Sequence, residues 1–213
     1  MITIWCPRRM TGAKLLVEKL NELGHDARRC VGGEPPAGAI LWGRGGGNKY
    51  EELQTLAAAG VPVPAHSLTK KADWLARRFQ HREANDLLAG LVVGDYYVEY
   101  VETKYEHRIH VFGDQSIRVA MKVPRTDEPH PKFRSWQAGW RFGVNPEYTA
   151  MLPPRARDYA VQACKALGYE FGAVDIATRM DGTAIVWEVN SGPGIEGSTV
   201  DAYAKAVIKK FSR

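Results

Sequence analysis

The strongest constraint on the fold is a pair of apolar segments near the C-terminus, residues 171–179 and 184–190, which the sequence Met-Asp-Gly-Thr separates. A short turn between two such segments predicts two antiparallel strands that pair with each other. Each segment carries one carboxylate among apolar residues, Asp175 in the first and Glu188 in the second. A carboxylate on a buried strand is unfavourable without a partner, so we expect both to face a charged group or a metal ion.

Asn190 lies two residues after Glu188, and residues two apart on a strand point to the same face. The oxygens of Asp175, Glu188 and Asn190 can therefore converge on one ion. Such hard oxygen ligands suit Mg²⁺ or Mn²⁺, with water and nucleotide phosphate oxygens in the remaining positions. The alternative is an edge strand with its carboxylates in solvent, and the apolar neighbours of both carboxylates argue against it.

Composition narrows the class of protein. The chain has 213 residues, of which 45% are hydrophobic and 25% charged, as expected for a folded globular protein and not for a disordered one. Cys6, Cys30 and Cys164 lack the spacing of a disulfide framework or a zinc site. No apolar stretch approaches the roughly 18 residues of a membrane span. We therefore expect a cytoplasmic protein without membrane contact.

The formal net charge of +5 favours anionic partners such as nucleotides, nucleic acid or an acidic polypeptide, without choosing among them. After Asn190, residues 191–197 read Ser-Gly-Pro-Gly-Ile-Glu-Gly. A glycine-rich turn of this kind exposes backbone amides that can receive an anionic group, although most such turns are only turns.

The first 47 residues read as strand, helix, strand, strand, which predicts a small parallel α/β unit. The helix is expected over residues 11–24, with Thr11 as its N-cap and Gly24 at its end. A glycine cluster at residues 43–47 separates this unit from a predicted small lobe over residues 48–95, with a helix at its start and a strand over 73–79.

From Tyr96 the pattern predicts a large lobe, residues 96–213. Its first three strands, over 96–102, 106–114 and 116–123, are expected to form one antiparallel meander. A helix over 154–168 precedes the C-terminal strand pair, and a short amphipathic helix over 201–211 ends the chain. The fold class is α/β with α+β lobes.

At this point the chain resembles the ATP-grasp ligases, particularly the RimK-like branch that joins amino acids to carboxylates. The sequences GAVD and EVNSGPGIEG are similar to that family's GVD, EVN and S-x-PG-x-EG motifs. The resemblance extends from Lys49 to the C-terminus. It implies two lobes that clasp ATP, preceded by a short Rossmann-like N-terminal unit, and ATP with Mg²⁺ as cofactors.

The resemblance also implies nucleotide contacts in the small lobe and the hinge. Lys49, at the start of a helix, corresponds to a lysine that contacts phosphates, and Arg77 stands in for a strand lysine, ahead of a loop that lacks the family's glycines. The backbone around Glu99, Tyr100 and Val101 would read the adenine edge. Glu106 would accept hydrogen bonds from the ribose hydroxyls.

Three cations would act on the reacting groups. Arg108, two residues after Glu106, resembles the arginine that stabilises charge on the γ-phosphate or the acyl phosphate, although an exposed Glu–Arg pair explains these two residues equally well. Lys122 and Arg134 would contact phosphate or substrate carboxylate. The family's asparagine after Arg-Ser is Trp136 here, and its contact is missing or comes from elsewhere, for instance Asn145.

The implied activity is that of an ATP-dependent, ADP-forming carboxylate–amine ligase, which makes an amide or peptide bond through an acyl phosphate. Its substrates would be small-molecule or peptide carboxylates and amines, including an acidic protein or peptide acceptor, and a homo-oligomer fits the family. One alternative is an ATP- and Mg²⁺-binding sensor or scaffold without catalysis. Another is nucleic-acid binding through aromatic residues beside arginines, but such aromatics are more often core residues.

Overall fold

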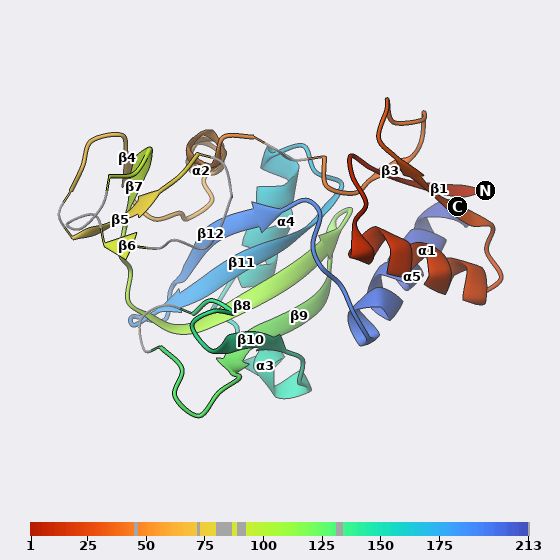
Figure 1. Ribbon diagram of the computed structural model, residues 1–213. Helices are drawn as coiled ribbons and strands as arrows, with labels where there is room; N and C mark the ends of the chain where they lie inside the picture. The colour runs from red at the N-terminus through yellow and green to blue at the C-terminus, as the bar shows by residue number, and fades with distance from the viewer. Residues whose placement is uncertain (45–46, 72, 80–86, 89–92, 131–133, 213) are drawn as a thin grey trace.

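The structure is a computed structural model that describes residues 1–44, 47–71, 73–79, 87–88, 93–130 and 134–212. It has three sheets arranged in a row, with the N-terminal unit at one end and the small lobe at the other (Figure 1). Among the described residues, no helix is both long and apolar enough to cross a membrane.

The N-terminal sheet is parallel, as predicted. Its central strand β1 (Ile2–Cys6) pairs with β2 (Ala27–Val31) on one side and β3 (Ile40–Leu41) on the other. Helix α1 (Thr11–Glu22) and the C-terminal helix α5 (Ser198–Phe211) pack together against it and share its core. The core of this unit thus combines both ends of the chain.

The predicted cap of α1 was wrong by one residue. The amide of Lys14 already donates to the carbonyl of Met10 at 3.2 Å, so Met10 is the N-cap and Thr11 is the first helical residue. No side chain caps this helix end. Gly24 follows the helix with φ +83°, a left-handed conformation that suits glycine at a helix end.

The second sheet forms the small lobe together with α2 (Lys49–Ala58), whose Leu53 packs against Tyr96 and Val98. Asn48 caps α2 by accepting a hydrogen bond from the Tyr50 amide at 2.9 Å. The four strands are antiparallel, and their order across the sheet is β4 (His66–Ser67), β7 (Tyr96–Glu99), β5 (Trp74–Arg77) and β6 (Leu87–Leu88).

The placement of β7 corrects the predicted meander. We expected the strand from Tyr96 to pair with the strands that follow it, but β7 pairs with β5 and β4 in the small sheet. Residues 100–102 then carry the chain into the next sheet. The run of strand-forming residues continues through this crossing, so the sequence pattern does not reveal it. By sheet membership, residues 96–99 belong to the small lobe.

The third sheet is antiparallel and supports the large lobe. Strands β11 and β12 form the predicted hairpin, and β8 and β9 form a second hairpin around Gly113 and Asp114. Its strands, in order across the sheet, are β10 (Trp140–Gly143), β9 (Gln115–Pro124), β8 (Thr103–Phe112), β11 (Phe171–Arg179) and β12 (Ala184–Asn190). Helices α4 (Ala156–Ala166) and α3 (Pro146–Ala150) complete the lobe.

The two faces of this sheet differ in character. On one face, α4 covers a buried apolar layer that includes Ile109, Val174 and Val186. The opposite face is charged, because strand alternation turns Glu106, Arg108, Asp175 and their neighbours away from α4. At one end of the charged face, the N-terminal unit packs onto the sheet. The indole ring of Trp42 lies 4.7 Å from the ring of Phe171.

Candidate functional site

An arginine–carboxylate pair lies at the centre of the charged face. Arg108 on β8 stands opposite Asp175 on β11 in the strand register. The guanidinium donates two parallel hydrogen bonds, from Nε to Oδ1 at 2.7 Å and from Nη2 to Oδ2 at 2.8 Å. Burial alone would lower the pKa of Arg108, but the Asp175 carboxylate outweighs it and holds that pKa above its ordinary value. Both oxygens of Asp175 are thus engaged.

The other two predicted metal ligands adjoin this pair. Glu188 on β12 stands opposite Asp175, and a β-bulge follows this pair along the hairpin. The side-chain amide of Asn190 donates to Glu188 Oε1 at 2.9 Å. The hairpin therefore brings Asp175, Glu188 and Asn190 onto neighbouring positions of one face, as the sequence spacing predicts.

These three side chains offer two carboxylates and one amide to a cation. Within the described part of the chain, no group of three or more His, Cys, Asp or Glu residues is placed to hold a metal ion. The donor set fits a hard cation that takes its remaining oxygens from water and phosphate. Arg108 has to share or release Asp175 before that carboxylate can serve as a ligand.

A second ion-pair cluster lies further along β8. Glu106 Oε2 lies 3.0 Å from Lys122 Nζ, and Glu106 Oε1 lies 3.8 Å from Arg134 Nε. Arg134 also donates from Nη2 to the carbonyl of Thr103 at 2.9 Å, which ties it to the start of β8. The structure thus places two predicted site residues, Lys122 and Arg134, around the carboxylate of a third, Glu106.

Phe142 joins the two clusters. Its ring lies 4.1 Å from the Arg108 guanidinium carbon and 5.5 Å from Lys122 Nζ, so it packs beneath both cations. The β10–β9 register places it opposite Lys122. Phe142 is one of the aromatic residues beside arginines that the sequence offered for nucleic-acid binding, and no role at this site was predicted for it. Its position follows from the pairing of β10 with β9. No pattern in the sequence predicts that pairing.

Lys49 connects the small lobe to the β11–β12 hairpin. It is the first residue of α2, and its Nζ lies 2.8 Å from Glu52 Oε2. The same ammonium donates to the carbonyl of Val189, between Glu188 and Asn190, at 3.3 Å. The structure therefore places Lys49 at the hairpin that carries two of the predicted metal ligands.

The residue at the position of the family's asparagine is exposed. Trp136 is 61% exposed, and the Arg125 guanidinium lies 4.4 Å from its ring. Asn145 caps α3, where its Oδ1 accepts a hydrogen bond from the Glu147 amide at 3.0 Å. That oxygen therefore has a partner in the protein, and a contact from Asn145 to phosphate stays a prediction.

The loop after Asn190 packs against the N-terminal unit, a contact that the sequence did not reveal. The amide of Gly43 donates to the carbonyl of Ser191 at 3.0 Å. A Cβ on Gly12 would lie 2.7 Å from the carbonyl oxygen of Pro193, and one on Gly192 would lie 2.8 Å from Gly43 Cα. Glycine is required at both positions because the backbones approach so closely.

Comparison with known proteins identifies this architecture. No protein-family model and no curated protein matches the sequence. Among solved structures, the ATP-grasp ligase PsnB complexed with minimal precursor matches with a TM-score of 0.71 and 15% identity, over 98% of each chain. The macrocyclase MdnC from Microcystis aeruginosa MRC, bound with precursor peptide MdnA, matches with a TM-score of 0.64 and 11% identity, over 98% of this chain and 99% of that one. This chain has the ATP-grasp fold.

A further ATP-grasp structure gives the same result. PsnB complexed with minimal precursor, Mg and ADP matches with a TM-score of 0.67 and 15% identity, over 98% of this chain and 96% of that one. At such identities the similarity establishes the ATP-grasp fold that the motifs predicted. The RimK-like branch stays a prediction.

The predicted adenine-reading segment lies at the crossing between the two ATP-grasp lobes. Glu99 ends β7, where its amide donates to the carbonyl of Ala65 at 2.8 Å and its Oε2 accepts from the Ala65 amide at 3.4 Å. Tyr100 and Val101 follow, before β8 begins at Thr103. Burial raises the pKa of Tyr100, so this phenol stays neutral at ordinary pH.

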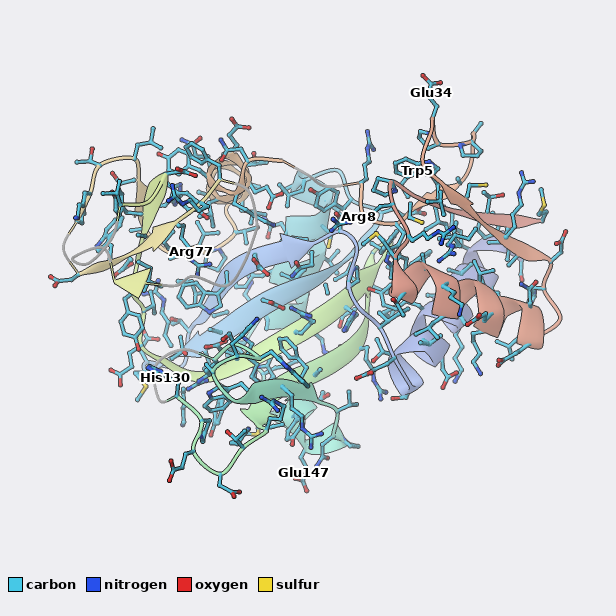
Figure 2. The ribbon with its side chains drawn as sticks, in the orientation of Figure 1. Trp5, Arg8, Glu34, Arg77, His130 and Glu147 are labelled. Atoms are coloured by element: carbon cyan, nitrogen blue, oxygen red, sulfur yellow. The ribbon has the colours of Figure 1, made fainter. Side chains whose placement is uncertain are left out.

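The predicted phosphate-covering part of the small lobe is placed only in part. Arg77 ends β5 and is labelled in Figure 2 within the small lobe. Arg78 donates to Asp95 Oδ1 at 2.9 Å. The glycine-free loop that follows, residues 80–86, lies outside the described residues.

Proposed function

We propose that this chain is an ATP-dependent carboxylate–amine ligase that forms an amide or peptide bond through an acyl phosphate. The observation that carries the proposal is the charged face of the large sheet. There Arg108, Asp175 and Glu188 meet on three neighbouring strands of an ATP-grasp fold. A face of this kind suits a reaction in which negative charge must be neutralised during phosphoryl transfer.

In this proposal ATP lies between the two lobes. The backbone from Glu99 to Val101 reads the adenine edge, and Glu106 accepts hydrogen bonds from the ribose hydroxyls. Lys49 and Arg77 contact the phosphates. The position of Lys49 supports its role, because its ammonium already reaches the hairpin backbone at Val189.

Asp175, Glu188 and Asn190 would hold Mg²⁺ or Mn²⁺. The bound ion would neutralise charge on the phosphates of ATP. Arg108 holds Asp175 through two hydrogen bonds. We propose that this guanidinium turns to the γ-phosphate when Asp175 becomes a metal ligand, so that one arginine serves both arrangements.

The reaction needs no covalent bond to the protein. A carboxylate oxygen of the first substrate attacks the γ-phosphorus of ATP, the bond to the bridging oxygen breaks, and ADP leaves. The nitrogen of an amine then attacks the acyl carbon, phosphate leaves, and the nitrogen loses one proton. Arg108, Lys122 and Arg134 stabilise the negative charge on the transferring phosphoryl group and on the substrate carboxylate.

A peptide is the proposed substrate class. Two observations support it: the similar ligases PsnB and MdnC are described with precursor peptides bound, and this chain carries a formal net charge of +5, which favours an acidic peptide.

The proposed organisation has three parts: an N-terminal unit, a small lobe and a large lobe. The N-terminal unit comprises residues 1–47. The small lobe ends at residue 99 and not at the predicted residue 95, because β7 belongs to the small sheet. The three cysteines are free thiols, which supports a location in the reducing cytoplasm.

One alternative is a nucleotide-binding module without catalysis. The pairing of both Asp175 oxygens with Arg108 favours it, as does the exposed Trp136 at the position of a polar family residue. In such a module, ATP and Mg²⁺ would bind but no acceptor would trigger the release of ADP.

The two functions are distinguished by measuring the rate of ADP formation when the protein is incubated with ATP, Mg²⁺, a mixture of peptides and a mixture of amines. We expect ADP formation to require both the peptides and the amines, and its rate to fall at least about a hundredfold in Glu188→Gln. Glu147→Gln is the matched control, because Glu147 lies exposed on α3, away from the site (Figure 2). Tight ATP binding without acceptor-dependent ADP would favour the binding module.

A further inference from the structure

A basic hollow lies in the N-terminal unit, at the carboxyl ends of β1 and β2. Its volume is about 470 Å³, and the residues that line it come from the β1–α1 connection, the first turn of α1 and the end of β2. The lining residues are Arg9, Met10, Thr11, Lys14, Arg29 and Val31. Three of these six side chains are cationic, and none is acidic.

The positive charges of this hollow are poorly neutralised. Among the described residues, no carboxylate forms an ion pair with Arg9 or Arg29. Arg29 donates to the carbonyl of Met10 at 3.4 Å. Lys14 pairs with Glu18 at 3.4 Å, but both side chains are about half exposed and such a pair contributes little. An anion in the hollow would relieve the repulsion among the three cations.

The hollow adjoins the loop that follows the metal-binding hairpin. Met10, which lines it, also contacts Gly192, and Gly12 in the same first turn of α1 packs against the Pro193 carbonyl. The carboxyl ends of parallel strands are also where open α/β sheets bind ligands. A peptide bound at the charged face of the large sheet could therefore extend into the hollow.

The lining also indicates which kind of anion fits. Met10, Thr11 and Val31 supply short apolar and hydroxyl contacts between the cations. None of the six lining residues is aromatic, so the hollow has no platform on which a nucleic-acid base could stack. Carboxylate side chains on a peptide match both the charge and the volume.

We infer that this hollow binds the carboxylates of an acidic segment of the peptide substrate, through Arg9, Lys14 and Arg29, away from the reacting carboxylate. The inference rests on the proposed ligase function, because it treats a peptide as the substrate. It adds a recognition site in the N-terminal unit. Arg9 and Arg29 act there by binding and not by chemistry.

Fluorescence polarisation tests the site with a fluorescein-labelled octapeptide of alternating Glu and Gly. We expect the wild-type protein to bind it, and Arg9→Gln and Arg29→Gln each to weaken binding by about fivefold or more. Arg28→Gln is the matched control: Arg28 neighbours Arg29 on β2 but is exposed and points to the other face of the sheet. It removes the same charge and should change binding by less than about twofold.

Three results would overturn the inference. They are equal weakening by Arg28→Gln, equal binding of the matched octapeptide with Gln in place of Glu, and tighter binding of a single-stranded octanucleotide that Arg9→Gln weakens. Arg9 is exposed, so Arg9→Gln keeps the test valid if Arg29→Gln unfolds. ATP binding with Mg²⁺, measured on the same samples, separates the two proposals: wild-type protein that binds ATP but not the peptide refutes this site, and wild-type protein that does not bind ATP refutes the ligase.

Discussion

At the scale of single residues, the main feature of the site is its ion pairs between cationic side chains and carboxylates. Arg108 holds Asp175, while Lys122 and Arg134 hold Glu106. Ion pairs of this kind give a carboxylate a partner in a partly buried place, where an unpaired carboxylate would be unfavourable. The cations of Arg108 and Lys122 also lie beside the ring of Phe142.

Replacing Arg108 should make stability depend on metal. In Arg108→Met, Asp175 loses its partner and faces Glu188 across the hairpin, so two carboxylates repel each other. We expect the free energy of unfolding to fall by about 2 kcal/mol in metal-free buffer, and millimolar Mg²⁺ to restore part of it. Urea denaturation with and without Mg²⁺ measures both effects.

Lys122→Met is the matched control for this experiment. It removes a cation of the same face, but its carboxylate partner is Glu106 and not a proposed metal ligand. The Mg²⁺ effect should therefore be absent there. If Mg²⁺ stabilises both variants equally, or if Arg108→Met loses no stability, the account of Asp175 is wrong.

The residue types of the site were readable from the sequence, but their partners were not. Asp175, Glu188 and Asn190 converge because one hairpin carries them, and that hairpin is local in sequence. Arg108 meets Asp175 across 67 residues of chain, and Lys49 meets Val189 across 140. Pairings of this range depend on how sheets associate, which periodicity does not encode.

At the scale of elements, close contact between α1 and the loop at 191–194 joins the N-terminal unit to the site. A methyl group on Gly12 would meet the Pro193 carbonyl at 2.7 Å. In an open helix, alanine would instead be favoured over glycine by about 1 kcal/mol. The sign of the stability change therefore reports on the contact.

We predict that Gly12→Ala lowers the free energy of unfolding by about 1 to 3 kcal/mol, through overpacking against the loop. Gly194→Ala is the control, because a Cβ there meets nothing within 4 Å and Gly194 is not among the glycines with positive φ. It should change stability by less than about 0.5 kcal/mol. If Gly12→Ala had a higher free energy of unfolding than the wild-type protein, α1 would not be closely packed against this loop. Thermal and urea unfolding of both variants provide the measurement.

Element types were more predictable than sheet membership. Helices were predicted at the places of α1, α2 and α4, the first of them from its apolar stripe, and the β11–β12 hairpin follows from its turn. The strand β7 was assigned to the wrong sheet, because residues 96–102 keep a strand-like composition while the chain crosses between lobes. No local signal in those residues marks the crossing.

At the scale of the whole molecule, buried histidines make stability depend on pH. His107 is fully buried in the large sheet on the face opposite the charged one, and burial lowers its pKa to about 4. His110 is also buried, and burial, with Arg108 and Arg118 nearby, lowers its pKa to about 3. Both are therefore neutral in the folded protein at pH 7.

The sign of the effect follows from proton binding. Between pH 6.5 and 4 the unfolded chain protonates these histidines while the folded protein does not, so stability is present above this range and falls as pH decreases through it. For His107 we predict a loss of about 2 kcal/mol between pH 7 and 5. His107→Phe should remove that part of the slope. Urea denaturation at several pH values tests this, and an unchanged slope in His107→Phe would contradict it.

The N-terminal unit and the large lobe also share one core, in which Trp42 and Tyr203 pack on Phe171. This shared core gives the N-terminal unit a fixed place beside the β11–β12 hairpin. The fold as a whole therefore places the loop at 191–194 between the basic hollow and the charged face.

The central claim is that the charged face of β8, β11 and β12 binds ATP together with a divalent cation. Calorimetric titration of ATP into wild-type protein, Glu188→Gln and Glu147→Gln tests it most directly, with and without Mg²⁺. We predict one ATP per chain, binding that needs Mg²⁺, and affinity at least about tenfold weaker in Glu188→Gln alone. The account would be contradicted if the affinity for ATP were the same with and without Mg²⁺ and in Glu188→Gln, or if no ATP bound at all.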